Sequence, residues 1–245
     1  MMNTSDIICA ISTSPGMGAI AVLRLSGDGC ISLTEQIFES PSGKHLSAAK
    51  GNTVHFGSIR DGKELIDEVL VTIFRAPHSF TGEESVEISC HGSVYIQQRL
   101  LKLLVDVGAR LAAPGEFTQR AFLNGKMDLS QAEAVADLIS SSSAASHRMA
   151  LLQMKGGFST ELMRLRSELL HITSLLELEL DFSEEDVEFA DRSRLNSLLE
   201  DIIVHVDRLI NSFRLGNAIK NGIPVAIAGA TNTGKSTLLN ALLGE

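Results

Sequence analysis

Eight residues near the end of the chain have the types and spacing of a phosphate-binding loop. The four fixed positions of the pattern G-x-x-x-x-G-K-S/T are Gly229, Gly234, Lys235 and Ser236. In such a loop, backbone N–H groups surround phosphate oxygens, the lysine reaches the terminal phosphates and the hydroxyl is a ligand of Mg²⁺. The alternative is a glycine-rich turn that matches by accident, which is expected in about one chain in a hundred of this length.

The sequence on both sides of this loop favours phosphate binding. Residues 223–228 predict a short buried strand and residues 236–243 predict a helix, in the order that a P-loop requires. Phosphoryl transfer also needs a second Mg²⁺ carboxylate, a group that orients the attacking water and a base-reading segment. We expect these to lie beyond Glu245, so the chain as given should not turn over nucleotide. A parallel strand without neighbours should also leave residues 223–245 poorly packed.

Three charged residues in the first half of the chain occupy positions where a charge needs an explanation. Arg24 shares one face of a predicted strand with apolar residues, and an unpaired guanidinium there costs several kcal/mol. Glu87 lies on the strand face opposite the apolar residues, which is either solvent or the wall of a cleft. Lys126 lies between two predicted helices, where an exposed lysine is ordinary. The pattern alone does not make these three a site.

Two further sets of potential metal ligands lack the spacing of a metal site. The acidic stretch 181–188 has neither EF-hand spacing nor a glycine for the sharp turn, so we interpret it as a solvated connection. The histidines form no H-E-x-x-H motif, and the pair Cys90-His91 has no third ligand at metal spacing. We therefore predict no zinc site.

The periodicity of apolar residues, which predicts the elements that position these residues, changes once, near residue 115. Before this point, short alternating segments predict an α+β domain with a hairpin at Asp61-Gly62. We expect strands at 5–11, 20–26, 52–60, 65–74 and 86–91 and helices at 29–39 and 93–106.

The rest of the chain predicts helices. A short helix over 115–123 should end at Asn124-Gly125, and a long one should begin at a capping box at Ser130 and end at Gly156-Gly157. Its polar run 140–143 should fray or pack closely against a neighbour. Two further helices should lie antiparallel, because each has one narrow apolar stripe. The stripes are Leu162, Leu165, Leu169, Ile172 and Leu176, then Leu195, Leu199, Ile202, Val206, Leu209 and Phe213.

Composition limits the class of protein. The 245 residues are 44% hydrophobic and 21% charged, which is typical of a globular chain with more than one core. The sequence has no apolar run of membrane-spanning length and no signal-peptide pattern, and its three cysteines are unclustered, so we expect a reduced, cytoplasmic setting. The net charge of −9 disfavours nucleic acid, so an RNA contact would need a local patch or a segment outside this chain.

Several segments resemble the MnmE family of tRNA modification GTPases, also called TrmE. Residues 76–92 and 114–135 are similar to the two long signatures of that family. Shorter similarities occur at 6–10, 15–18 and 23–27. The P-loop follows two long helices at the expected distance, so the resemblance covers the whole chain.

This resemblance implies three parts. They are an α+β folate-binding and dimerisation domain over 1–118, an incomplete α-helical bundle over 119–222, and the start of an inserted α/β P-loop GTPase domain over 223–245. Members of the family hydrolyse GTP and act as homodimers with MnmG, a flavin- and NADH-dependent partner, in a heterotetramer. They add a carboxymethylaminomethyl or aminomethyl group to C5 of wobble uridine 34 of certain tRNAs, with a one-carbon unit from tetrahydrofolate.

The family's site residues can be carried over by position. The resemblance implies that 5-formyl- or 5,10-methylene-tetrahydrofolate is bound by Arg24, Glu87 and Lys126. It implies that Ser236 binds Mg²⁺ and that Asn232 helps to hold K⁺. The implied GTP contacts are Asn232, Thr233, Gly234, Lys235, Ser236 and Thr237. Thr231 stands where the family usually has proline, and no catalytic residue is assigned because those segments would follow Glu245.

Two alternative functions stay open at this point. A ribosome-assembly type of P-loop GTPase would share residues 232–237 but has no reason to carry the N-terminal signatures. The fragment could also act only as a folate-binding, dimerising module, which we expect to be closer to the behaviour of the chain as given. Titration with folate and with GTP separates these functions.

Overall fold

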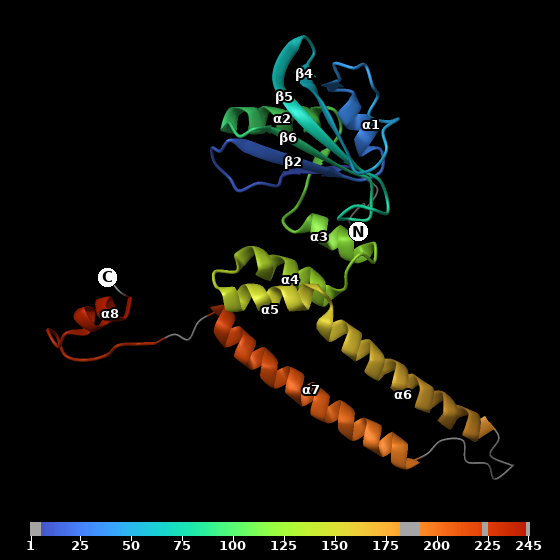
Figure 1. Cartoon of the computed structure of the whole chain (residues 1–245), viewed down its shortest axis with the longest axis vertical. Helices are drawn as coiled ribbons and strands as arrows, with labels where there is room; N and C mark the ends of the chain where they lie inside the picture. Colours follow the sequence, from blue (N-terminus) through green and yellow to red (C-terminus); the bar gives the residue numbers. More distant parts are fainter. Residues whose placement is uncertain (1–5, 182–191, 222–224, 244–245) are drawn as a thin grey trace. The chain divides into compact units, whose positions relative to one another are not determined.

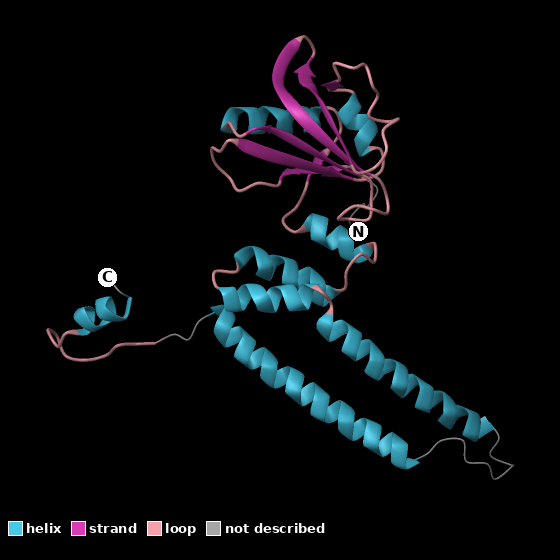
Figure 2. Cartoon of the chain, viewed as in Figure 1, coloured by secondary structure: helices cyan, strands magenta, loops and turns pink. Residues whose placement is uncertain are grey.

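The computed structural model describes residues 6–181, 192–221 and 225–243 (Figure 1). The chain divides into two compact units, Met1–Ala136 and Asp137–Glu245. Strands occur in the first unit, and in the described part of the second unit all regular structure is helical (Figure 2). The α+β region and the helical region predicted from the change of period are therefore both present.

The first unit contains a seven-stranded mixed sheet with the order β3-β4-β5-β6-β2-β1-β7. Paired strands are antiparallel except β1 and β7, which are parallel. The five predicted strands and the β4–β5 hairpin are confirmed, whereas the two-residue strands β3 and β7 are too short to show a period. The strands are β1 (Ile8–Ile11), β2 (Ile20–Ser26), β3 (Phe38–Glu39), β4 (Thr53–Asp61), β5 (Glu64–Phe74), β6 (Ser85–His91) and β7 (Arg110–Leu111).

Helices α1 (Cys30–Glu35) and α2 (Val94–Asp106) pack on one face of this sheet. Alternate residues of the central strands, among them Leu23, Val71 and Ile88, are fully buried in the core that these helices complete. The expected helix over 29–39 is too long, because Phe38 and Glu39 instead pair with β4. This strand pairing with a distant part of the chain overrides the local helical pattern.

The other face of the sheet carries a mixture of exposed apolar and charged residues. Ile20, Val54 and Phe56 are 67%, 59% and 54% exposed. Arg24 and Glu87 lie on this face as direct partners in the β2–β6 register. The sheet is therefore packed on one face and open over a large part of the other.

The predicted long helix from Ser130 is wrong, because the chain forms two helices there. α4 (Leu129–Ser140) and α5 (Ala144–Met154) are separated by the serine run that the sequence marked as a weak point. The Ser143 side chain accepts a hydrogen bond from Ser146 N at 3.1 Å and caps α5, since serine competes for backbone groups better than it continues a helix. At the start of α4, Asp128 and Gln131 form the reciprocal cap in place of Ser130.

The remaining helices are α3 (Glu116–Leu123), α6 (Gly157–Asp181), α7 (Arg192–Asn221) and α8 (Lys235–Leu243). α3 is confirmed within one residue, and α6 and α7 run antiparallel within the second unit (Figure 1). None of the described helices combines the length and apolarity needed to cross a membrane.

The apolar stripes of α6 and α7 are only partly buried. Leu165, Ile172 and Leu198 are 9% exposed or less, whereas Leu162 and Leu199 are 47% and 42% exposed. Leu198 was not among the predicted stripe residues. Of the predicted acidic connection 181–188, residues 182–188 lie outside the described residues, and so do the side chains of Leu209 and Phe213.

The predicted strand before the P-loop is not formed over residues 225–229, and residues 223 and 224 lie outside the described range. A parallel strand needs neighbouring strands to bond its backbone groups. Val225, at the start of this segment, is 80% exposed. The segment therefore lacks the sheet partners that a strand requires.

Candidate functional site

Arg24 and Glu87 form an ion pair on the open face of the sheet. The Arg24 Nε and Nη2 atoms donate to the same carboxylate oxygen, Glu87 Oε1, at 2.9 and 2.7 Å. Each side chain is 28% exposed. The structure thus brings together two of the residues expected in the folate site, and it supplies the carboxylate that a guanidinium on this face needs.

Two aromatic rings lie against the same guanidinium. The Arg24 Cζ atom is 5.3 Å from the ring centroid of Phe80 and 5.8 Å from that of Phe117. A cation at this distance from a ring face is attracted by its quadrupole. Sequence reasoning missed both rings as site residues, although each lies in one of the two long signature segments.

Lys126 adjoins the loop that carries Phe80. Its Nζ donates to the carbonyl oxygen of Pro77 at 3.0 Å. Its aliphatic stem passes beside Gly82, where an added Cβ would lie 3.1 Å from Lys126 Cγ. The third expected residue is therefore anchored to the loop between β5 and β6, and its ammonium group retains donors for a ligand.

This group of side chains suits a flat heteroaromatic ligand with a negatively charged tail. Among the described residues, Glu87 Oε2 has no hydrogen-bond partner, so this oxygen can accept from ring N–H or amino groups. Phe80 and Phe117 offer apolar ring surface, and Lys126 offers a positive charge. No group of three His, Cys, Asp or Glu residues in the described part of the chain could hold a metal ion. These side chains are therefore suited to binding a ligand of that kind.

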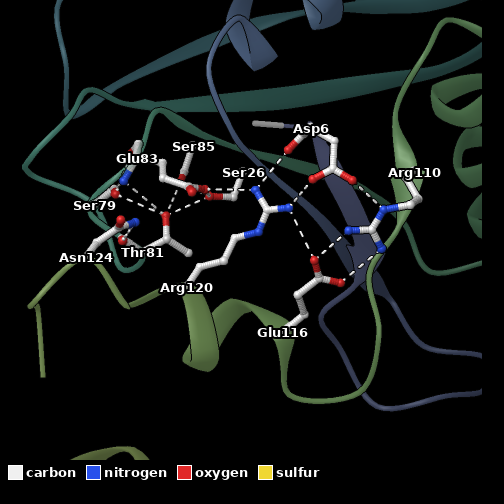
Figure 3. A network of polar contacts seen from close by, with 10 residues as sticks. All are labelled: Asp6, Ser26, Ser79, Thr81, Glu83, Ser85, Arg110, Glu116, Arg120 and Asn124. Carbon is white, nitrogen blue, oxygen red and sulfur yellow. Dashed lines mark hydrogen bonds and ion pairs between the residues drawn. The ribbon is translucent and has the colours of Figure 1, made fainter. Parts of the chain in front are cut away.

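A partly buried polar cluster joins α3 to the loop between β5 and β6 and to the segment before β1 (Figure 3). We call it the Arg120 network; its members are Asp6, Glu83, Arg110, Glu116 and Arg120. Arg120 is 2% exposed and donates to Asp6 O at 2.8 Å, to Glu116 Oε1 at 3.2 Å and to Glu83 Oε2 at 3.4 Å. Sequence reasoning did not single out this network, because its partners lie up to 114 positions apart.

The hydroxyl groups beside this network hold the loop in place. Ser26 Oγ lies 2.6 Å from Thr81 Oγ1 and donates to Glu83 Oε2 at 2.7 Å. Asn124 Nδ2 donates to the carbonyl oxygen of Thr81 at 2.8 Å (Figure 3). The loop is thereby bonded to β2 on one side and to the end of α3 on the other.

Hydrogen bonds from Arg110 favour the ionised form of two carboxylates of the network, those of Glu116 and Asp6. They are the main cause that lowers the pKa of Glu116 from 4.5 to about 2. The same arginine is the main cause that lowers the pKa of Asp6. Both carboxylates are negatively charged at neutral pH, so the contacts of Arg120 and Arg110 with them are charge-assisted.

The P-loop is shaped by contacts within its own segment. Asn232 and Gly234 have φ values of 63° and 84°, and Lys235 begins α8. Lys235 Nζ donates to the carbonyl oxygens of Gly229 at 3.1 Å and Ala230 at 2.6 Å. The loop therefore leads into a helix N-terminus, where backbone N–H groups favour anions.

Comparison with known proteins gives the family. Residues 7–126 match the family described as GTP-binding protein TrmE N-terminus, and residues 129–235 match the MnmE helical domain. Proteins named tRNA modification GTPase MnmE from Bacteroides thetaiotaomicron and Bacteroides fragilis are each 64% identical over 241 residues, which is 98% of this chain. The chain belongs to the MnmE family. The resemblance stated from the sequence is confirmed.

The MnmE relatives are longer than this chain. A protein of the same name from Flavobacterium johnsoniae is 58% identical to this chain over 244 residues. In each of these three comparisons the chain spans 52% of the relative's length. The two MnmE domain matches meet between residues 126 and 129, where α3 has ended and α4 begins. A ribosome-assembly GTPase has no reason to carry these domains, so the matches disfavour that alternative.

Proposed function

We propose that this chain is the folate-binding and helical part of an MnmE-type tRNA modification GTPase. The observation that carries the proposal is the Arg24–Glu87 pair, flanked by Phe80 and Phe117, inside the segment that matches the TrmE N-terminus. These residues offer a hydrogen-bond acceptor and aromatic surface within one region, and Lys126 adds a cation. Folates have the matching ring donors, ring faces and carboxylates.

The two ends of the folate would meet different residues. Glu87 would accept from the amino and N–H groups of the pterin, and Arg24 would orient that carboxylate while the rings of Phe80 and Phe117 lie against its guanidinium. Lys126 would meet the glutamate tail, since an ammonium group on an exposed loop suits a flexible carboxylate. We assign 5-formyl- or 5,10-methylene-tetrahydrofolate to this site.

We propose that the whole protein acts as its relatives' name indicates. It would hydrolyse GTP, with residues 232–237 contacting the nucleotide, Ser236 binding Mg²⁺ and Asn232 helping to hold K⁺. With MnmG, in the cytoplasm, it would modify C5 of wobble uridine 34 in certain tRNAs. The support is the 64% identity to proteins named tRNA modification GTPase MnmE. The residues of the first unit are proposed to bind folate.

Dimerisation is the remaining part of the proposal. The open face of the sheet exposes Ile20, Val54, Phe56 and Leu70, the last at 46%. Apolar residues gathered on one face mark an association surface. We propose that two copies of the chain associate through the first unit.

The limits 1–118, 119–222 and 223–245 remain predicted domain boundaries.

Calorimetric titration with 5-formyltetrahydrofolate tests the proposed function. We expect saturable binding by the chain and at least tenfold weaker binding by Arg24→Ala and Glu87→Gln. The matched control is Arg60→Ala, because Arg60 pairs with Glu39 at 2.7 Å elsewhere in the same sheet. A folded chain that does not bind folate, or a Glu87→Gln variant with full affinity, would contradict the assignment.

A further inference from the structure

Helix α3 is held to its unit largely by charged groups. Its buried residues are Glu116, Arg120 and Ala121, whereas Phe122 and Leu123 are 40% and 58% exposed. Apolar packing is non-directional and tolerates small shifts, but hydrogen-bonded ion pairs fix distances and angles. The position of α3 is therefore set mainly by the geometry of the Arg120 network.

Arg120 connects three separate segments of the chain. Its partners are Asp6 before β1, Glu83 in the loop before β6, and Glu116 in the first turn of its own helix. Arg110 repeats two of these connections, with Asp6 Oδ2 at 2.5 Å and Glu116 Oε1 at 2.6 Å (Figure 3). Glu116 also accepts from Ala113 N at 2.7 Å, which fixes the start of the helix.

The segments that the network connects are the ones that carry the ring and lysine contacts of the folate site. Phe117 follows Glu116 directly in α3, and Lys126 comes three positions after the helix ends at Leu123. Phe80 lies in the same loop as Glu83. A shift of α3 would displace Phe117 and Lys126, and a shift of the loop would displace Phe80.

We infer that Arg120 is a positioning residue of the folate site, acting through Phe117 and Lys126 without touching the ligand. This inference rests on the proposed folate function. The side chain is suited to the role because a planar guanidinium can bond Asp6, Glu83 and Glu116 at the same time, whereas a lysine is a point charge on a flexible stem. Arg120→Lys thus keeps the positive charge and removes the planar group that can bond Asp6, Glu83 and Glu116 at the same time.

A thermodynamic cycle on the full chain tests the inference. Calorimetry would give the dissociation constant of 5-formyltetrahydrofolate for the original chain, Arg120→Lys, Phe117→Ala and the double variant. We expect Arg120→Lys to weaken binding roughly tenfold in the original chain and less than about threefold in the Phe117→Ala background, because residues that act through one another are not additive. Arg60→Lys is the control and should leave binding unchanged. Equal losses in both backgrounds would overturn the inference, since Arg120 would then act only on overall stability.

A second readout needs no ligand. With fluorinated phenylalanine incorporated, the ¹⁹F resonance of Phe117 is identified by its loss in Phe117→Ala. We expect Arg120→Lys to shift or broaden this resonance in a chain whose circular dichroism stays native, and Arg60→Lys to leave it in place. A chain that binds no folate while this resonance moves would contradict the proposed function and support the positioning role. An unmoved resonance would overturn the positioning role whether or not folate binds.

Discussion

The two candidate binding sites of this chain differ in how far apart their parts lie in the sequence. In the P-loop, Lys235 contacts Gly229 and Ala230, at most six positions away. In the proposed folate site, Arg24 contacts Glu87 across 63 positions, and its guanidinium also lies against Phe117. A motif search finds the first kind of site completely. The second kind exists only when a sheet, a loop and a helix are in place.

The two sites also differ in the contacts that hold them in place. The described part of the P-loop segment is exposed and is held by contacts within itself. The proposed folate site adjoins a partly buried ionic network whose members come from four segments. Perturbing the network should therefore change the folate site strongly, and perturbing the P-loop should change little else.

Acid should destabilise the first unit through Glu116. Because the pKa of Glu116 is lowered from 4.5 to about 2 in the folded chain, its stabilising effect is complete above about pH 4.5 and is lost as the pH falls to about 2. The expected loss is on the order of 3 kcal/mol of the free energy of unfolding. Urea unfolding followed by Tyr95, the only tyrosine in the chain, measures it. Glu116→Gln should flatten the dependence of the free energy of unfolding on pH. If the curves of this variant and of the original chain were parallel, Glu116 would not stabilise the fold through the network.

Removal of the carboxylate partner should nearly abolish folate binding. Glu87→Ala removes the acceptor and leaves Arg24 unpaired on the sheet face. We expect about a hundredfold loss of affinity by calorimetry, consistent with a lost charge-assisted contact. Glu39→Ala is the matched control, since Glu39 pairs with Arg60 on β4. If both variants lost the same folate affinity, the Arg24–Glu87 pair would be no different from an ordinary surface pair.

Substitution of Gly82 should weaken folate binding through Lys126. Gly82 has φ 81° and an added Cβ would press on the lysine stem, whereas Gly62 has φ 60° with nothing within 4 Å of an added Cβ. Gly82→Ala and Gly62→Ala should each lose about 1 kcal/mol of stability from the positive φ. Only Gly82→Ala should also lose folate affinity, by several-fold in the same titration. Loss of affinity in Gly62→Ala would show that backbone strain alone is responsible.

The smallest effect is expected in the P-loop. Lys235→Ala removes only contacts to the carbonyl oxygens of Gly229 and Ala230, so the free energy of unfolding should change by less than about 0.5 kcal/mol. Folate affinity should stay the same. Thermal and urea unfolding measure the first quantity and calorimetry the second. A large change in either would mean that the P-loop segment is coupled to the rest of the chain.

A large part of the fold follows from sequence pattern. The strand containing Arg24 and the one containing Glu87 are predicted within one residue, because one buried face imposes a period of two. The break at Ser143 was only partly anticipated, since serine both tolerates a helix and caps the next one. Residues 38–39 were predicted as helix, because their strand pairing depends on Ser58 and Ile59 of β4, which lie 19 and 21 positions later than their partners.

The sequence by itself determined the P-loop motif and the two signature segments, and it left three charges, on strands or between helices, without an explanation. Only the tertiary structure decided that Arg24 meets Glu87, that Phe80 and Phe117 cover the guanidinium, and that Arg120 fixes the helix beside them. The physical reason is the range of the forces involved. Periodicity and turn chemistry act between near neighbours along the chain, whereas an ion pair across a sheet forms only after strands distant in sequence have come together.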